Sequence, residues 1–196
     1  MDLKRFDLIV LNSSGGKDSI AMIYEVCRMA DAQGFPRSNI VVSHQCLGKM
    51  EWGGVTELVY EQAKMFGLPV TLSKRTANNS ETLLEYAERR GKWPGSDTRW
   101  CTSDFKRAPG DKALIAARNE KGAKMVLNCY GFRAQESPAR SKKNPYKMNK
   151  RLTFKNRKVK VYDWLPIHKW DTAKVWKTIK GIKVLKIFAP RYLVKI

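Results

Sequence analysis

The residues that could do chemistry begin with a short run of glycine and hydroxyl residues, Ser13-Ser-Gly-Gly-Lys-Asp-Ser19. Gly15 and Gly16 lack a Cβ atom, so the backbone at these positions can approach a ligand closely. The run precedes an amphipathic segment, and the free N–H groups at the start of a helix favour an anion. The pattern predicts an anion-binding turn whose candidate binding residues are Ser13, Ser14, Gly15, Gly16, Lys17, Asp18 and Ser19.

Two charged residues of this turn are candidate catalytic groups. Lys17 could add a positive charge beside the anion, and Asp18 could cap the following helix or hold a metal ion. An ordinary glycine-rich connection between a strand and a helix is the alternative. The complete run, placed between an apolar and an amphipathic segment, makes that alternative the weaker one.

Cys101 is the candidate nucleophile of the sequence. Arg99, Lys106 and Arg107 flank it in the segment RWCTSDFKR, and nearby cations lower the pKa of a thiol and favour the reactive thiolate. The same cations are candidates for binding the phosphate or sulfate of a substrate. A role for Cys101 as one ligand of an iron–sulfur cluster, or as a structural cysteine, stays open.

A further group of charged residues lies in the segment GFRAQESPAR, which begins at Gly131. Arg133 and Arg140 could each bind phosphate or sulfate through two hydrogen bonds. Glu136 could orient one arginine or bind a metal. A surface ion-pair loop is the alternative.

The elements that must position these residues alternate between short apolar runs and amphipathic segments. Such alternation predicts an α/β fold with a doubly wound, mainly parallel sheet flanked by helices. Ligands bind such sheets beyond the carboxyl ends of the strands, where the candidate residues fall. Ser80 is expected to cap a helix. The expected strands are residues 6–11, 39–46, 68–73 and 123–131, and the expected helices are residues 18–34, 55–67, 80–91 and 110–122.

The last third of the chain is strongly basic. Residues 140–196 carry 18 lysines and arginines against two carboxylates, a net charge of +16 within a total of +20. Such a block favours nucleic acid or a phosphate-rich ligand, and a solvated basic face is the alternative. Residues 133–150 are expected to form a basic lid or long surface loop. A basic hairpin around Asn156 and a helix are expected to follow.

Length and composition limit the class of protein. The 196 residues are 43% hydrophobic, which suits a single folded domain over residues 1–196. No apolar run is long enough for a membrane span. The four cysteines form no CxxC pair, so a reducing, cytoplasmic location is expected. Cys27 and Cys129 lie in apolar patterns and are expected in the core.

The run SSGGKDS resembles the PP-loop, SGGxDS, of the adenine nucleotide alpha-hydrolase superfamily, which includes ATP pyrophosphatases and phosphoadenosine phosphosulfate (PAPS) reductases. The resemblance covers residues 6 to 180 and implies a nucleotide-binding fold with ATP or PAPS as ligand and Mg²⁺ as a candidate companion. A homodimer is also expected. The segments in the order and spacing of PAPS reductase-like proteins are EWGG from Glu51, TLLEYAERRGKWP from Thr82, RWCTSDFKRAP from Arg99, GFRAQESPAR from Gly131 and WLPIHKWDTAKVWKTI from Trp164.

The chain departs from the family pattern at two places. Similar proteins read His-x-Asp-x-Gly where this chain has His44 and then Cys46, so a carboxylate near the nucleotide or metal is missing. His44 itself is a candidate nucleotide-binding residue. Family reductases use a C-terminal cysteine that attacks the sulfur of PAPS and is recycled by thioredoxin. No cysteine follows Cys129, so we expect an ending that is truncated or unlike the family's, and a thioredoxin-like reductant is not expected.

Three functions remain open. The first is a PAPS reductase-like enzyme with Cys101 as the reactive thiol, although the paired cysteines of a four-cysteine iron–sulfur cluster are missing. The second is an ATP pyrophosphatase-type enzyme that adenylates or thiolates a nucleic acid. The third is a nucleotide-binding or nucleic-acid-binding protein that has lost catalysis. The lysine-rich composition would also suit a phage or mobile-element protein.

Overall fold

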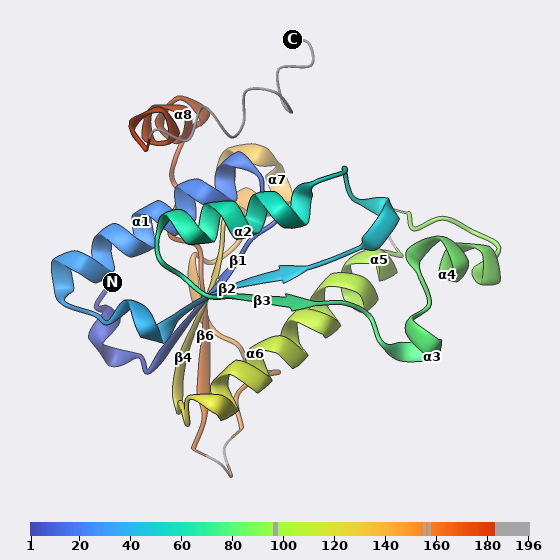
Figure 1. Cartoon of the computed structure of the whole chain (residues 1–196), viewed down its shortest axis with the longest axis horizontal. Helices are drawn as coiled ribbons and strands as arrows, with labels where there is room; N and C mark the ends of the chain where they lie inside the picture. The colour runs from blue at the N-terminus through green and yellow to red at the C-terminus, as the bar shows by residue number, and fades with distance from the viewer. Residues whose placement is uncertain (96–97, 155, 157, 183–196) are drawn as a thin grey trace.

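The computed structural model describes residues 1–95, 98–154, 156 and 158–182, and a six-stranded sheet forms its centre (Figure 1). The strand order is β3-β2-β1-β4-β6-β5, and every neighbouring pair is parallel except β5 with β6. The predicted mainly parallel sheet is confirmed. The strands are β1 (Leu8–Asn12), β2 (Ile40–Gln45), β3 (Val70–Ser73), β4 (Met125–Tyr130), β5 (Tyr146–Met148) and β6 (Lys160–Trp164).

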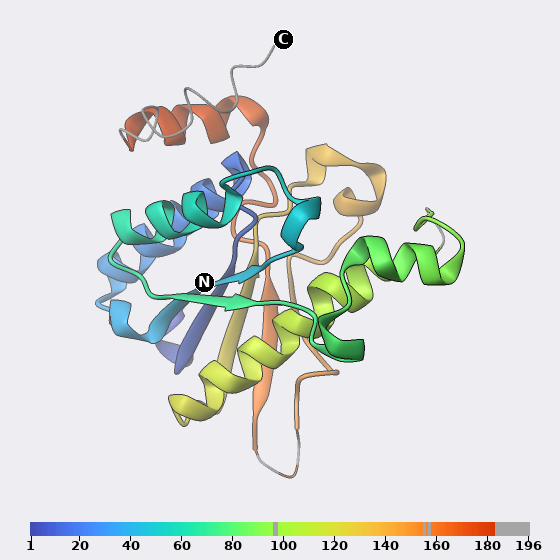
Figure 2. The same ribbon diagram turned by 45° about the vertical axis from the view of Figure 1, so that its right-hand side comes forward.

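Helices cover both faces of the sheet, as a doubly wound fold requires. Figures 1 and 2 show α1, α2 and α8 on one side and α6 on the other. The helices are α1 (Lys17–Gln33), α2 (Val55–Met65), α3 (Ala77–Ser80), α4 (Leu83–Arg90), α5 (Trp100–Thr102), α6 (Ala108–Glu120), α7 (Pro138–Ser141) and α8 (Thr172–Gly181). Short 3-10 turns are η1 (Leu3–Arg5), η2 (Arg37–Asn39), η3 (Gly48–Met50) and η5 (Ala134–Glu136), and η4 (Ser103–Arg107) is a π-helical turn.

The side chains of β1 alternate between two hydrophobic cores. Ile9 and Leu11 join the core beneath α1, whereas Leu8 and Val10 join the core beneath α6. All four are almost completely buried. Burial on both faces is typical of a parallel strand between two layers of helices, and it explains why the segment is apolar throughout.

The direction of winding reverses between β1 and β4. The chain runs from β1 outward to β2 and β3, and then returns to place β4 on the other side of β1. The connections that leave the carboxyl ends of β1 and β4 therefore run toward opposite sides of the sheet. In such folds the crevice between two diverging connections is the usual ligand position. The two connections are those that follow Asn12 and Tyr130.

One local prediction, the helix cap at Ser80, is wrong. Ser80 does not cap the following helix; it ends α3 with a positive φ of 64°. Thr82 caps α4 instead, and a capping box with Glu85 completes the turn. The segment expected to form a basic lid or long surface loop, residues 133–150, contains two short elements, α7 and the edge strand β5.

The end of the chain is described in part. Phe154 and Val159 form an isolated antiparallel bridge on either side of Asn156. Residues 155 and 157 lie outside the described part, so the expected hairpin stays a prediction. The C-terminal departure from the family falls mainly on residues 183–196, which also lie outside it. No helix among the described residues is long and apolar enough to cross a membrane.

Candidate nucleotide-binding site

The run Ser13–Ser19 connects β1 to α1, as the sequence predicts. Gly15 has a φ of 74°, a conformation that L side chains rarely adopt. A Cβ atom built there would lie 3.4 Å from both Val55 Cγ1 and Val59 Cγ2 of α2. Gly15 is therefore required by backbone conformation and packs tightly against α2.

Two of the three serines hold the loop in shape. Ser13 Oγ accepts the N–H of Gly15 at 3.2 Å, and Ser19 Oγ accepts the N–H of Ser14 at 3.1 Å. Ser13 and Ser19 are buried, whereas Ser14 is exposed. Ser14 is thus the hydroxyl of the loop best placed to meet a ligand.

The start of α1 is open to an anion. Gly16 is the N-cap residue, and no side chain caps the helix there. The first N–H groups of a helix lack partners within the helix and carry the positive end of its dipole. The 17-residue helix therefore directs hydrogen-bond donors and positive potential at the crevice.

Asp18 lies between two cations. Its Oδ2 is 2.8 Å from Lys17 Nζ, and its Oδ1 accepts a 2.6 Å hydrogen bond from Arg133 Nε. Arg133 is only 3% exposed. Its Nη1 also donates to Gln135 Oε1 and to Thr172 Oγ1 of α8, at 3.1 Å and 3.3 Å. Arg133 consequently joins the loop, the β4 connection and α8.

Gly131 allows this close approach. A Cβ atom at Gly131 would lie 3.0 Å from the backbone oxygen of Asp18 and 3.1 Å from its carbonyl carbon. Such contacts are tighter than most that real Cβ atoms make, and because the neighbour is backbone, a larger residue would require the segment after β4 or the start of α1 to shift. The structure thereby places Gly131 and Arg133 beside the loop, where the sequence predicts them.

Glu136 and Arg140 form an ion pair within the α7 region. Glu136 also accepts the backbone N–H of Arg133 at 2.7 Å, so it orients the arginine segment. His168 is buried, and its Nε2 lies 3.0 Å from the backbone oxygen of Arg140. This position agrees with a structural role for His168.

His44 lies behind the loop and not in the crevice. The residue is 1% exposed, and its Nδ1 lies 2.9 Å from the backbone oxygen of Ser13. Because that oxygen can only accept, Nδ1 must carry a proton. Nε2 lies 3.3 Å from Glu51 Oε2, close enough for an ion pair, although the alignment falls short of a hydrogen bond. His44 therefore supports the loop from below.

Glu51 is the acidic partner of His44. Burial raises the pKa of Glu51, but the contact with His44 and the charge of Lys106 outweigh burial and hold this pKa below its ordinary value of 4.5. Cys46, which replaces the family's aspartate, accepts the N–H of Gly48 through its sulfur at 3.3 Å. The connection after β2 thus carries a carboxylate at Glu51, although the aspartate of the family pattern is replaced by Cys46.

Gln62 was missed by the sequence analysis. It is completely buried in α2, and its Nε2 donates to the backbone oxygen of Gly15 at 2.8 Å. The signal was present, because Gln62 occupies the apolar face of its helix together with Val55, Leu58 and Val59. A glutamine at such a position indicates a specific buried acceptor.

A polar network across three strands was also missed. Asn12 Nδ2 donates to Asn128 Oδ1 at 2.7 Å, and Asn128 Nδ2 donates to Asp163 Oδ1 at 3.0 Å. Asn149 Nδ2, from the segment after β5, donates to the same carboxylate at 3.0 Å. The network joins the residue before the PP-loop to β4, β6 and the edge of the sheet. Polar residues within apolar strands were its sequence signal.

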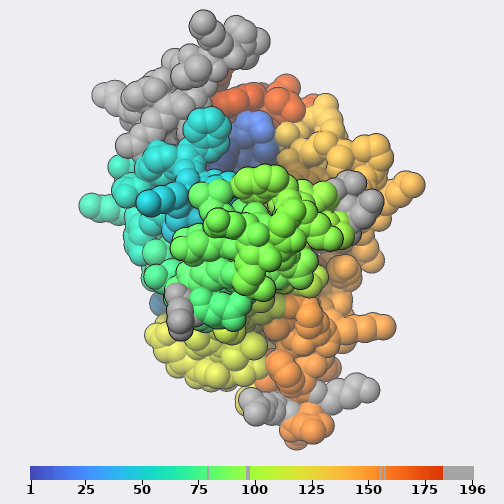
Figure 3. All heavy atoms as spheres, turned by 90° about the vertical axis from the view of Figure 1, so that its right-hand side faces the viewer, coloured from blue at the N-terminus to red at the C-terminus, as the bar shows by residue number. Residues whose placement is uncertain are grey.

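Cys101 lies apart from the loop, in a third hydrophobic cluster. The cluster contains Tyr86, Trp100 and Phe105, and Cys101 is partly buried against it. Among its described contacts, the sulfur lies 3.9 Å from Thr102 Oγ1. Figure 1 shows α4 and α5 beyond the carboxyl ends of β2 and β3, and Figure 3 shows the green surface of this region in front of the blue surface of N-terminal residues.

The cations beside Cys101 are exposed and two of them affect the crevice. Arg99, Lys106 and Arg107 are all exposed. The charge of Lys106 lowers the pKa of Glu51, and the charge of Arg107 opposes the rise that burial causes in the pKa of Tyr130 at the end of β4. Lys106 and Arg107 therefore lie near the carboxyl ends of β2 and β4.

The acidic residues of the described part do not form a metal centre. No group of three histidine, cysteine or carboxylate residues there could hold an ion, and Asp18 is already paired with Lys17 and Arg133. The donor set does not fit a resident metal ion.

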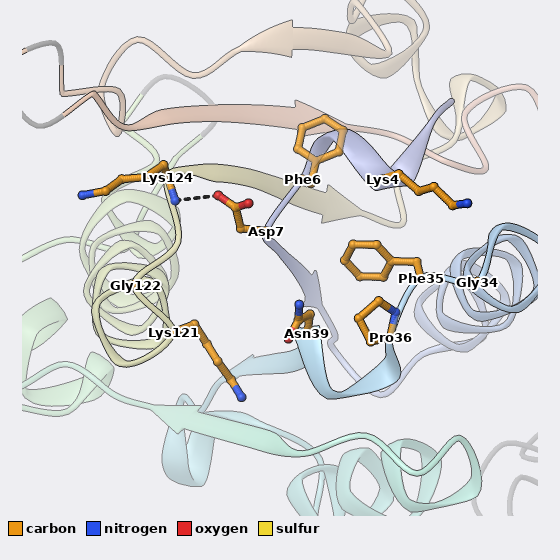
Figure 4. A pocket seen from close by; sticks show the side chains of 10 residues that line it. All are labelled: Lys4, Phe6, Asp7, Gly34, Phe35, Pro36, Asn39, Lys121, Gly122 and Lys124. Atoms are coloured by element: carbon orange, nitrogen blue, oxygen red, sulfur yellow. Dashed lines mark hydrogen bonds between the residues drawn. The ribbon is translucent and has the colours of Figure 1, made fainter.

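A cavity of about 530 Å³ lies at the opposite end of the sheet (Figure 4). Its walls come from residues that precede strands, since Asp7 precedes β1, Asn39 precedes β2 and Lys124 precedes β4. Asp7 Oδ2 accepts the backbone N–H of Lys124 at 2.8 Å and closes one wall. The cavity is therefore separate from the PP-loop.

Fold and loop define a nucleotide-binding enzyme class of the PP-loop type, the adenine nucleotide alpha-hydrolases. The profile of the "Phosphoadenosine phosphosulfate reductase domain" matches residues 8–189, and the chain belongs to this family. The resemblance found in the sequence is confirmed.

Similar solved structures include two of Candida glabrata FMN adenylyltransferase. The complex with FMN and the ATP analog AMPCPP is 12% identical with a TM-score of 0.48, covering 88% of this chain and 48% of that one. The second is 13% identical with a TM-score of 0.47, covering 88% and 46%. The chain thus spans about half the length of these structures. No curated protein matches it.

Proposed function

We propose that this PP-loop enzyme binds an adenine nucleotide that carries sulfate, such as PAPS, and acts in sulfur-nucleotide chemistry. The observation that carries the proposal is the position of Asp18 between Lys17 and Arg133 at the open start of α1. A phosphate or sulfate that replaced the carboxylate would meet two cations and the helix N–H groups. Membership of the PAPS reductase family supports the nucleotide.

Cys101 is the proposed nucleophile of the reaction. Its thiolate would attack the sulfate sulfur, the bond from sulfur to the phosphate oxygen would break, and the adenosine phosphate would leave. A dithiol reductant would then attack the sulfonated cysteine, becoming a disulfide and releasing sulfite. The cations that would favour the thiolate and the anionic substrate are Arg99, Lys106 and Arg107.

An ATP pyrophosphatase-type reaction is the second candidate. It is favoured by the location of Cys101, which packs against the aromatic cluster of α4 and α5 and has no described contact with the PP-loop. In this reaction a nucleophile on the substrate attacks the α-phosphorus of ATP, and pyrophosphate leaves. The loop residues, with Lys17 foremost, would stabilise the charge that develops on the phosphates.

Calorimetric titration with ATP, PAPS and adenosine phosphosulfate tests the nucleotide site. Lys17→Ala is expected to weaken binding at least tenfold, whereas Lys64→Ala on the far side of α2 is the matched control and should bind as the wild type does. Sulfite release from PAPS with dithiothreitol, lost in Cys101→Ser, would support the first reaction. Pyrophosphate release from ATP would support the second. Failure of all three nucleotides to bind would refute the proposal.

A further inference from the structure

The outer edge of the sheet carries exposed, unpaired positive charge. β5 is the last strand in the sheet order, and Lys142, Lys143, Lys147 and Lys150 on and around it are all exposed. The described ion pairs include none of these four lysines. We use the name edge track for the exposed cations Lys143, Lys147, Lys150, Arg151 and Arg107.

Part of the edge track lies on the α6 face of the sheet. Lys147 is directly opposite Asp163 in the antiparallel pair of β5 and β6, and directly opposite residues share one face. Arg151 follows and forms an ion pair with Asp111 of α6. Lys147 and Arg151 therefore lie on or beside the face that α6 covers.

Like charges in the edge track are close enough to repel one another. The pKa of Arg151 is lowered by burial and then by the positive charge of Arg107, which Asp163 offsets only in part. Arg151 nevertheless stays 45% exposed. Cations gathered in this way, with too few carboxylates nearby, create a positive potential that an anion relieves.

The end of the edge track at Lys143 is connected through Phe132 and Arg140 to the candidate nucleotide site. Lys143 Nζ lies 6.0 Å from the centre of the Phe132 ring, and Arg140 lies over the same ring at 4.6 Å. Phe132 in turn stacks on Tyr130, with ring centres 5.4 Å apart. Arg140 is linked through Glu136 to the segment of Arg133, which contacts the PP-loop.

The cations are spread along the chain and not gathered at one point. Lys143 precedes β5, Lys147 lies within it and Lys150 follows it, so the positive charges form a row, as a polyanion requires. Aromatic and arginine side chains beside such a track are typical of surfaces that bind single strands.

We infer that the edge track binds the phosphodiester backbone of a nucleic-acid strand, which leads toward the nucleotide site over Phe132. The evidence for a nucleic-acid-binding surface is the edge track alone. The idea that nucleic acid is also the substrate of the enzyme rests on the proposed function. The competing explanation is that lysines at a sheet edge prevent edge-to-edge pairing between molecules.

Fluorescence anisotropy with labelled 20-nucleotide single-stranded DNA, duplex DNA and RNA between 50 and 300 mM salt tests the inference. The wild type is expected to bind at least one of them with a steep salt dependence. The double variant Lys147→Gln, Lys150→Gln should reduce the slope of log K against log salt by about 1.4 for a single strand and about 1.8 for a duplex. The matched control is Lys64→Gln, Lys74→Gln, which removes the same charge around the opposite edge strand, β3.

Equal losses in the two double variants, or binding of none of the nucleic acids, would overturn the inference. So would a Lys147→Gln, Lys150→Gln variant that self-associates in sedimentation but binds nucleic acid normally, because this result is expected of edge protection. Binding only to phosphatidylserine vesicles would also overturn it. Lys17→Ala separates the two proposals, since it should lose the nucleotide and keep the nucleic acid.

Discussion

Arg133 Nε and Asp18 Oδ1 lie 2.6 Å apart, although 115 positions separate the two residues in the chain. The contact ties the connection after β4 to the first turn of α1. The same carboxylate also holds Lys17. Both cations next to the PP-loop are thus engaged by one aspartate, and an incoming phosphate must compete with it. Nucleotide binding and the local ion pairs are therefore expected to be coupled.

Asp18→Asn should reveal this coupling. Removing the carboxylate leaves the buried Arg133 guanidinium uncompensated, so the free energy of unfolding should fall by about 3 kcal/mol. A bound phosphate can restore the missing charge. In thermal denaturation, saturating nucleotide should consequently raise the Tm of Asp18→Asn by more than it raises that of the wild type.

Asp31→Asn is the control for that experiment. Asp31 pairs with Arg37 at the surface, where its side chain is 58% exposed, so the change should have little effect on stability because water and salt screen such a pair. An Asp18→Asn protein as stable as Asp31→Asn would contradict the buried ion pair.

Gly131→Ala should disturb the loop without altering any charge. The new Cβ atom would lie 3.0 Å from the backbone oxygen of Asp18, and backbone cannot move aside as a flexible side chain can. A loss of about 1–3 kcal/mol is expected, together with weaker nucleotide binding. Gly181→Ala, which meets nothing within 4 Å at the end of α8, should leave the stability unchanged or raise it slightly in chemical denaturation, because alanine favours the helix. Equal stability of the two variants would argue against the close approach.

The Glu51–His44 contact should make the loop sensitive to acid. The pKa of Glu51 is below its unfolded value of 4.5, with burial opposing and the His44 contact favouring the shift. The carboxylate therefore contributes stability above pH 4.5 that is lost as the pH falls through the lower folded value. The difference in unfolding free energy between wild type and Glu51→Gln should shrink across that range in urea titrations. A difference that stays constant down to pH 3 would contradict a stabilising role for the Glu51 carboxylate.

The four cysteines should divide into two classes on alkylation. Burial raises the pKa of Cys27 to about 11 and that of Cys129 well above its ordinary value, so both stay protonated near neutral pH. Cys46 and Cys101 are partly exposed. Brief treatment of the native protein with iodoacetamide at pH 8, followed by mass spectrometry, should label Cys46 and Cys101 alone. Labelling of Cys27 before Cys101 would contradict the structure.

Much of the fold was predictable because its signals are local. The alternation of apolar runs and amphipathic segments predicts the strands and helices of the sheet. The prediction that Ser80 caps a helix was wrong because Thr82, two residues later, forms a capping box with Glu85. The strand within the expected lid was missed, since β5 has three residues and depends on pairing with β6.

The candidate site was predictable only in part. The loop residues and Gly131 come together as expected, because both follow strands that the fold makes adjacent. The partner of Arg133 was not predictable, since its pairing with Asp18 depends on how β4 and α1 pack. The hydrogen bond from Gln62 to the backbone oxygen of Gly15 was not predictable either, since it depends on how α2 packs against the loop. His44 shows the same limit, because its position at a strand end does not reveal which way the ring points.

The third cluster gives the region around Cys101 a stability of its own. Its aromatic residues pack with one another, and Arg75, Arg89 and Arg90 lie over the ring of Tyr86 at 4.8, 4.9 and 5.0 Å. Neither sheet core includes them. This unit can therefore open while the sheet remains folded, and amide hydrogens of α4 should exchange earlier than those of β1. Such opening would expose Cys101, which is partly buried against the cluster.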